Sequence, residues 1–121
     1  MRPPEALPTV DVHAAAERLR ESDPPLLVDV REPNEFAAVR APGAALLPLS
    51  TFLLRFRHLP KDRPLLVMCA VGGRSAAATA HLLASGFADV TNIAGGIIAW
   101  ERAGLPVRYG DPEPGEGDLP G

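Results

Sequence analysis

The stretch from residue 65 to residue 86 constrains the fold of this 121-residue chain more than any other part. It begins with the apolar run Leu65-Leu66-Val67-Met68, whose length suits a buried strand. Two adjacent glycines follow soon after and allow a tight turn. The alanine-rich residues 75–85 then predict a helix, with Gly86 placed to end it. A strand that turns directly into a helix indicates an α/β fold with a parallel sheet.

The rest of the chain shows the same alternation of short apolar runs and helical patterns. Further strands are expected at residues 9–10, 26–30, 44–49 and 89–93. Further helices are expected to start near Asp11, Pro33, Ser50 and Gly96. Asp11 and Ser50 are residue types that cap helix N-termini, and proline suits a first helical turn. The length favours one domain built from these elements.

The only cysteine of the chain, Cys69, stands directly after the apolar run. A thiol reacts as its thiolate, and the partial positive charge of a helix N-terminus favours an anion. The following glycines can turn successive backbone N–H groups towards one point, and an arginine adds a fixed positive charge. The loop is therefore expected to hold an ionised sulfur, open to solvent, without a histidine base. The loop residues are Ala70, Val71, Gly72, Gly73 and Arg74.

A simpler interpretation makes Cys69 a small buried apolar residue, as a lone cysteine after an apolar strand usually is. Two adjacent glycines followed by arginine and serine are not needed to bury a thiol. The loop sequence therefore favours the reactive interpretation.

Four blocks of sequence, in order, resemble the rhodanese (sulfurtransferase) family. The first contains an Asp-x-Arg-x-x-x-Glu-aromatic pattern, the second a Pro-Gly-Ala turn, the third the cysteine loop and the fourth a Gly-Gly-x-x-x-Trp pattern. The four blocks are residues 27–36 (LVDVREPNEF), 41–44 (APGA), 69–75 (CAVGGRS) and 92–100 (NIAGGIIAW). Residues 104–107 (GLPV) resemble the usual ending of the family, so the resemblance covers nearly the whole chain.

This resemblance implies a rhodanese-like three-layer α/β domain, with a central, mostly parallel sheet of four or five strands and helices on both faces. It also implies a transferase similar to thiosulfate sulfurtransferases, in which Cys69 is catalytic and carries a persulfide while residues 70–74 bind the substrate. The donor would be a small sulfane-sulfur compound such as thiosulfate, and the acceptor cyanide or a thiol. A sulfur-acceptor protein would be a further partner. No cofactor and no metal are expected.

The strand predicted at residues 26–30 brings Asp29 and Arg31 to its carboxyl end, and Glu35 follows a few residues later. Ligands of open α/β sheets bind at the carboxyl ends of strands. The favoured interpretation is an ion-pair network that ties the loop down. In this interpretation the three residues, together with Ser75, support the site rather than react. Arg40 stands close to the place where the family usually has a histidine.

Two other functions remain open. Ala70 follows the cysteine, where the family often has arginine or lysine, so a cation near the sulfur is missing. A slowly reacting sulfur carrier or an interaction module is therefore one alternative. A phosphatase or arsenate reductase of a related loop type is less favoured. Those loops follow Cys-x5-Arg, whereas Cys69 and Arg74 are separated by four residues, and the tighter ring suits a single sulfur better than a phosphate.

Composition and charge limit the remaining possibilities. The net charge is −3, but four acidic residues lie in the Gly/Pro-rich end of the chain, so the body carries too little positive charge to suggest nucleic-acid binding. No secretory signal or membrane-spanning stretch is evident, and a lone cysteine fits a reducing, cytoplasmic setting. The expected organisation is an extended lead-in over residues 1–8, a domain over 9–108 and a disordered acidic tail over 109–121.

Overall fold

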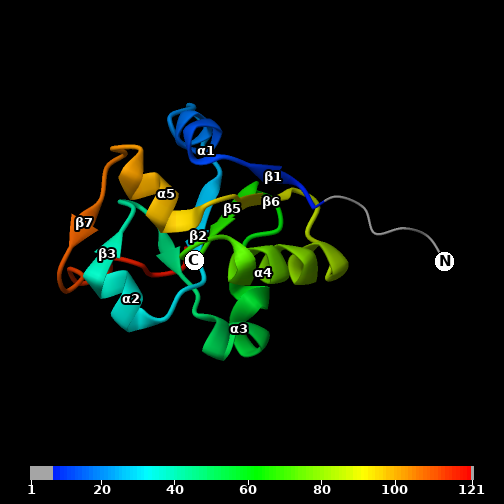
Figure 1. Cartoon of the computed structure of the whole chain (residues 1–121). Coiled ribbons are helices and arrows are strands. Elements are labelled where there is room, and N and C mark those ends of the chain that lie inside the picture. Colours follow the sequence, from blue (N-terminus) through cyan, green and yellow to red (C-terminus); the bar gives the residue numbers. More distant parts are fainter. Residues whose placement is uncertain (1–6, 121) are drawn as a thin grey trace.

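The computed structural model describes residues 7–120 and contains a five-stranded, all-parallel sheet with the strand order β1-β6-β5-β2-β4 (Figure 1). This confirms the predicted α/β class and the upper of the two expected strand numbers. The strands are β1 (Thr9–Val10), β2 (Leu26–Asp29), β4 (Ala45–Leu46), β5 (Leu65–Met68) and β6 (Val90–Ile93).

The central strand is β5, which pairs with β2 on one side and β6 on the other. Val67 lies opposite Val28 of β2 and opposite Asn92 of β6. All four residues of β5 are buried, as expected for a parallel strand covered on both faces. The strand that precedes the cysteine is thus the best-shielded strand of the sheet.

Helices cover both faces of the sheet and give three layers (Figure 1). One face packs against α1 (Val12–Leu19) and α5 (Gly96–Arg102), and the other against α3 (Leu49–Arg55) and α4 (Gly73–Ala84). The short helix α2 (Pro33–Ala38) contributes Phe36 to the α1/α5 side, and the 3-10 turn η1 (Phe56–His58) follows α3. Apolar residues of the sheet divide between the two clusters, because successive side chains of a strand point to opposite faces.

Local sequence signals account for most helix ends. Asp11 caps α1 by accepting a hydrogen bond from the backbone N–H of Ala14 at 2.8 Å, and Gly86 takes a φ of +93° just beyond α4. The prediction for Ser50 is wrong, because α3 begins earlier, with Pro48 at its N-cap. The Ser50 hydroxyl instead donates to Glu32 at 2.6 Å, a long-range contact that local sequence does not announce.

The acidic C-terminal segment lies against the body of the domain. Strand β7 (Arg108–Tyr109) pairs antiparallel with β3 (Val39–Arg40), and the chain then returns along the open edge of β4. There the backbone N–H of Leu46 donates to the carbonyl of Gly117 at 2.7 Å, and Leu119 packs on the α3/α4 side of the core.

Composition predicted disorder for this segment. The structure differs because a carboxylate of the segment forms an ion pair with the buried guanidinium of Arg40. Arg40 is 2% exposed, and its guanidinium donates to the Glu116 carboxylate at 2.6 and 2.9 Å. A buried arginine without a counter-charge is costly, so the pair holds the segment in place. The pKa of Glu116 falls from 4.5 to about 2, chiefly because of the hydrogen bonds from Arg40.

Most of the extended lead-in predicted for residues 1–8 falls outside the described residues. Between residues 7 and 120, none of the helices has the length and apolar character required to span a bilayer.

Candidate active site

The loop that carries Cys69 lies at the carboxyl end of the parallel sheet, between β5 and α4. β5 ends at Met68 and α4 begins at Gly73, so the loop is only four residues long. Gly72 is the N-cap of α4 and has a φ of +117°, a conformation that glycine adopts without strain. This sharp turn places the cysteine in front of the N-terminus of α4, as the sequence predicted.

The start of α5 closes the loop from the other side. The backbone N–H groups of Ile97 and Ile98 donate to the carbonyls of Cys69 and Ala70 at 2.9 and 3.2 Å. Gly96 makes this approach possible, because a Cβ at that position would lie 2.3 Å from the Cys69 oxygen. Gly96 is therefore required by the cysteine loop, whereas a Cβ at Gly95 would meet Ala99 of α5 itself. The carbonyls of Cys69 and Ala70 are bonded to α5.

One backbone amide and one side-chain hydroxyl contact the sulfur of Cys69. The Gly72 amide donates to Sγ at 3.1 Å, and the thiol lies 3.3 Å from the Ser75 hydroxyl. Burial raises the pKa of the Cys69 thiol, but the Ser75 hydroxyl and the amides of Ser75, Gly72 and Val71 outweigh it, so the pKa lies below its ordinary value. No histidine takes part in this balance.

The expectation that the sulfur is open to solvent is wrong. Cys69 is 1% exposed and belongs to the same apolar cluster as Val67, Phe52 and Ala78. The reason is its position at the end of the central strand, beneath α3 and α4. The simpler interpretation of a buried cysteine is thus correct for packing. The reactivity of the thiol stays a prediction, which the hydrogen bond from the Gly72 amide to the sulfur supports. Val71, by contrast, is 66% exposed at the rim of the loop.

Arg74 points to α2 rather than to the sulfur. Its two terminal nitrogens donate to the two carboxylate oxygens of Glu35 at 2.7 and 2.8 Å. These hydrogen bonds lower the pKa of Glu35 from 4.5 to about 2 and raise the pKa of Arg74. Both residues remain about one-third exposed, so the pair is a solvent-screened clamp that joins α4 to α2.

Only part of the expected ion-pair network forms, because Asp29 pairs with Arg31 while the Glu35 carboxylate pairs with Arg74. Asp29, which is fully buried, accepts hydrogen bonds from Nε and Nη2 of Arg31, the shortest at 2.7 Å. Arg31 also donates to the carbonyls of Glu35 and Val39 at 3.2 and 2.7 Å. The structure therefore brings Asp29, Arg31 and Glu35 together, with Arg31 linking the end of β2 to α2 and to the segment after it.

Asn92 belongs to the site and was missed by sequence reasoning. Its Oδ1 lies 2.6 Å from the Ser75 hydroxyl, and both residues are buried. Asn92 comes from β6, the neighbour of β5, so the contact depends on strand order. The available signal was a polar amide within an otherwise apolar strand.

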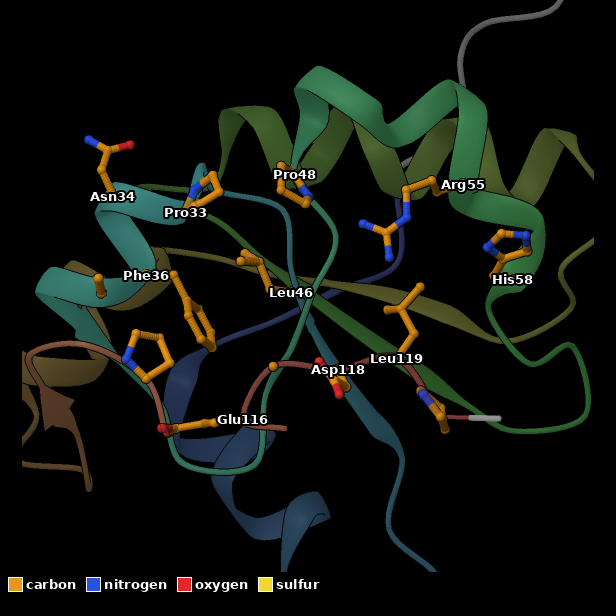
Figure 2. A pocket seen from close by; sticks show the side chains of 14 residues that line it. Pro33, Asn34, Phe36, Leu46, Pro48, Arg55, His58, Glu116, Asp118 and Leu119 are labelled. Carbon is orange, nitrogen blue, oxygen red and sulfur yellow. The ribbon is translucent and has the colours of Figure 1, made fainter. Parts of the chain in front are cut away.

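A cavity of about 880 Å³ lies apart from the cysteine loop (Figure 2). It opens between α2, α3 and the C-terminal segment, and no residue of the loop lines it. Figure 2 shows Arg55 and His58 on the α3 side and Asp118 and Leu119 on the opposite side. This cavity is distinct from the cysteine site.

The fold and the site define a class of protein: a parallel α/β domain with a cysteine held at the N-terminus of a helix by backbone amides. Residues 11–103 match the model of the rhodanese-like domain. The chain belongs to the rhodanese-like domain family.

Relatives and solved structures agree with this assignment. A sulfurtransferase from Allochromatium vinosum is 41% identical over 98 residues, which cover 81% of this chain and 92% of that protein. The thiosulfate sulfurtransferase GlpE from Vibrio cholerae is 36% identical over 99 residues, covering 82% and 92%. A rhodanese-related protein from Thermoplasma volcanium superposes with a TM-score of 0.77 at 29% identity, covering 84% of this chain and 97% of that one.

Proposed function

We propose that this protein is a sulfurtransferase that carries sulfane sulfur as a persulfide on Cys69. Family membership and the relatives named sulfurtransferases support sulfur transfer in general. The observation that carries the persulfide proposal is that the Gly72 amide and the Ser75 hydroxyl both contact the sulfur of Cys69.

The proposed reaction has two half-reactions, as in other covalent catalysis. The Cys69 thiolate attacks the outer sulfur of a donor such as thiosulfate. The sulfur–sulfur bond of the donor breaks, its electron pair leaves with sulfite, and a Cys69 persulfide anion remains. A second nucleophile, cyanide or a thiolate, then attacks the outer sulfur. The cysteine thiolate leaves with the electron pair of that bond, so the enzyme is regenerated without a net redox change.

The loop suits an anionic sulfur better than a large oxyanion. Four residues separate Cys69 from Arg74, and both terminal nitrogens of Arg74 are engaged by Glu35. A phosphatase would need that guanidinium for its substrate. These contacts argue against the phosphatase or arsenate reductase alternative, and an assay with a generic aryl phosphate is expected to give no turnover.

The donor is the less constrained part of the proposal. Ala70 contributes no charge, and its carbonyl is used by α5. A small anion such as thiosulfate therefore finds less positive charge at the loop than arginine or lysine would give. A sulfur-carrier role predicts full persulfide loading with slow release to the acceptor.

Mass spectrometry of the intact chain after incubation with a sulfane donor tests the proposal. We expect one added sulfur that cyanide removes, and no addition in a Cys69→Ser variant, which has no other thiol. Steady-state kinetics with thiosulfate and with other sulfane donors then separates an enzyme from a carrier. Turnover that survives in the Cys69→Ser variant would refute the persulfide mechanism.

A further inference from the structure

The Ser75 hydroxyl has more hydrogen-bond partners than it can serve with its single proton. Its oxygen lies 2.6 Å from Asn92 Oδ1, 3.2 Å from the Gly72 carbonyl and 3.3 Å from Cys69 Sγ. Ser75 is fully buried, so water does not supply a further donor. The direction of this one proton therefore depends on what the cysteine sulfur offers.

With the thiol protonated, the three groups form a chain that runs one way. The Cys69 thiol donates to the Ser75 hydroxyl oxygen, and the hydroxyl donates to Asn92 Oδ1. When the thiol proton leaves to solvent, the sulfur can only accept. To stabilise the thiolate, the hydroxyl must turn towards it, which leaves two oxygen acceptors 2.6 Å apart.

Asn92 can relieve that conflict because its carboxamide has a donor and an acceptor of nearly the same shape. A half-turn of the amide replaces Oδ1 by Nδ2, which then donates to the Ser75 oxygen. In the side-chain hydrogen bonds among residues 7–120, Asn92 takes part only as an acceptor through Oδ1, so the turn breaks no bond donated by Nδ2. The backbone stays fixed, since Asn92 N–H donates to the carbonyl of Pro8 at 2.8 Å and the residue pairs with Val67 of β5.

We propose that Asn92 is a positioning residue whose carboxamide turns from acceptor to donor when Cys69 ionises, and so releases the Ser75 hydroxyl to hydrogen-bond the sulfur. The inference rests on the proposed function only in requiring that Cys69 ionises. Asn92 does not touch the sulfur or a substrate; it acts through Ser75.

Side-chain amide NMR of the intact protein tests this directly. The chain has two asparagines and no glutamine, so the spectrum contains only the amides of Asn92 and of Asn34, which is exposed on α2. In a pH titration, we expect the chemical shift of the Asn92 side-chain amide to change with the same midpoint as the ultraviolet absorbance of the thiolate. The chemical shift of the Asn34 amide should stay constant. In Ser75→Ala and in Cys69→Ser the Asn92 shift is expected to disappear. An Asn92 amide that stays constant through the thiol titration would overturn the proposal.

A double-mutant cycle supplies a second readout. In Asn92→Asp the side chain is nearly isosteric, and its carboxylate only accepts. It should hold the hydroxyl proton, raise the thiol pKa and reduce the thiolate population roughly tenfold at pH values below that pKa. The added charge alone also acts, and the Ser75→Ala background isolates that part. We expect a clearly smaller effect in that background; equal effects in both backgrounds would contradict the proposal.

Neither measurement requires sulfur transfer. If the chain never forms a persulfide but the Asn92 amide follows the thiol titration, the proposed function fails and the inference stands. If the persulfide forms while the chemical shift of the Asn92 amide stays constant, the proposed function stands and the inference fails.

Discussion

Replacing Gly96 by alanine tests whether α5 really shapes the cysteine loop. A Cβ at Gly96 would lie 2.3 Å from the carbonyl oxygen of Cys69 and 2.5 Å from that of Ala70. Both neighbours are backbone atoms, so no flexible side chain can move aside. Gly96 also has a φ of +55°, which an alanine adopts at a cost of about 1–2 kcal/mol.

The magnitude combines this backbone cost with three further contributions. Overpacking against fixed atoms costs roughly 1–3 kcal/mol. Moving α5 away weakens the hydrogen bonds from Ile97 and Ile98 to the loop, each worth about 0.5–1.5 kcal/mol. The reduced freedom of the unfolded chain offsets about 0.4–1 kcal/mol. We therefore expect Gly96→Ala to lower the free energy of unfolding by roughly 3–5 kcal/mol, a large part of a typical domain's stability.

The matched control is Gly73→Ala. Gly73 is the first residue of α4 and has no positive φ. Among residues 7–120, no heavy atom outside its chain neighbours and the backbone of α4 would lie within 4 Å of the alanine methyl group. This variant should be neutral or more stable by about 0.4–1 kcal/mol. Urea unfolding followed by the fluorescence of Trp100, the single tryptophan, measures both variants. Equal midpoints for the two variants would refute the reasoning about the close approach of α5.

Three further predictions concern charged groups. Because its pKa is lowered, Cys69 should show a thiolate absorbance midpoint below that of an ordinary thiol, and unfolding the protein in urea should move the midpoint up. The pKa of Glu35 is about 2 in the folded protein, so its stabilising effect is complete at pH values above 4.5 and is lost as the pH falls towards 2. The difference in urea midpoint between wild type and Glu35→Gln should therefore vanish over that pH range. Glu116→Gln, which leaves the buried Arg40 without its counter-charge, should lower the thermal midpoint more than the control Glu113→Gln, and similar losses in both would contradict the assigned pairing.

Sequence patterns predicted the elements whose signals are local. The apolar run before Cys69 became the central strand, Asp11 capped α1, and Gly86 followed the end of α4. These outcomes depend on hydrophobic periodicity and on the backbone preferences of single residues. The expected contact between Asp29 and Arg31 also followed from local spacing, since the two residues are two positions apart at the end of a strand.

Contacts between distant segments were not accessible in the same way. Asn92 meets Ser75 only because β6 pairs with β5, and Ser50 reaches Glu32 across 18 positions. The composition of the C-terminal segment suggested disorder because it contains few apolar residues. The deciding factor was the buried Arg40, whose need for a carboxylate cannot be recognised before its burial is known.

The return of the C-terminal segment along β4 has a practical consequence for the limits of the folding unit. The family match ends at residue 103, yet the hydrogen bond from Leu46 to Gly117 and the packing of Leu119 lie beyond it. A chain cut at the family boundary would present a bare strand edge, which invites association with other chains. Fusion partners and affinity tags are therefore better joined to the N-terminus, where they leave the covering of the β4 edge by the C-terminal segment intact.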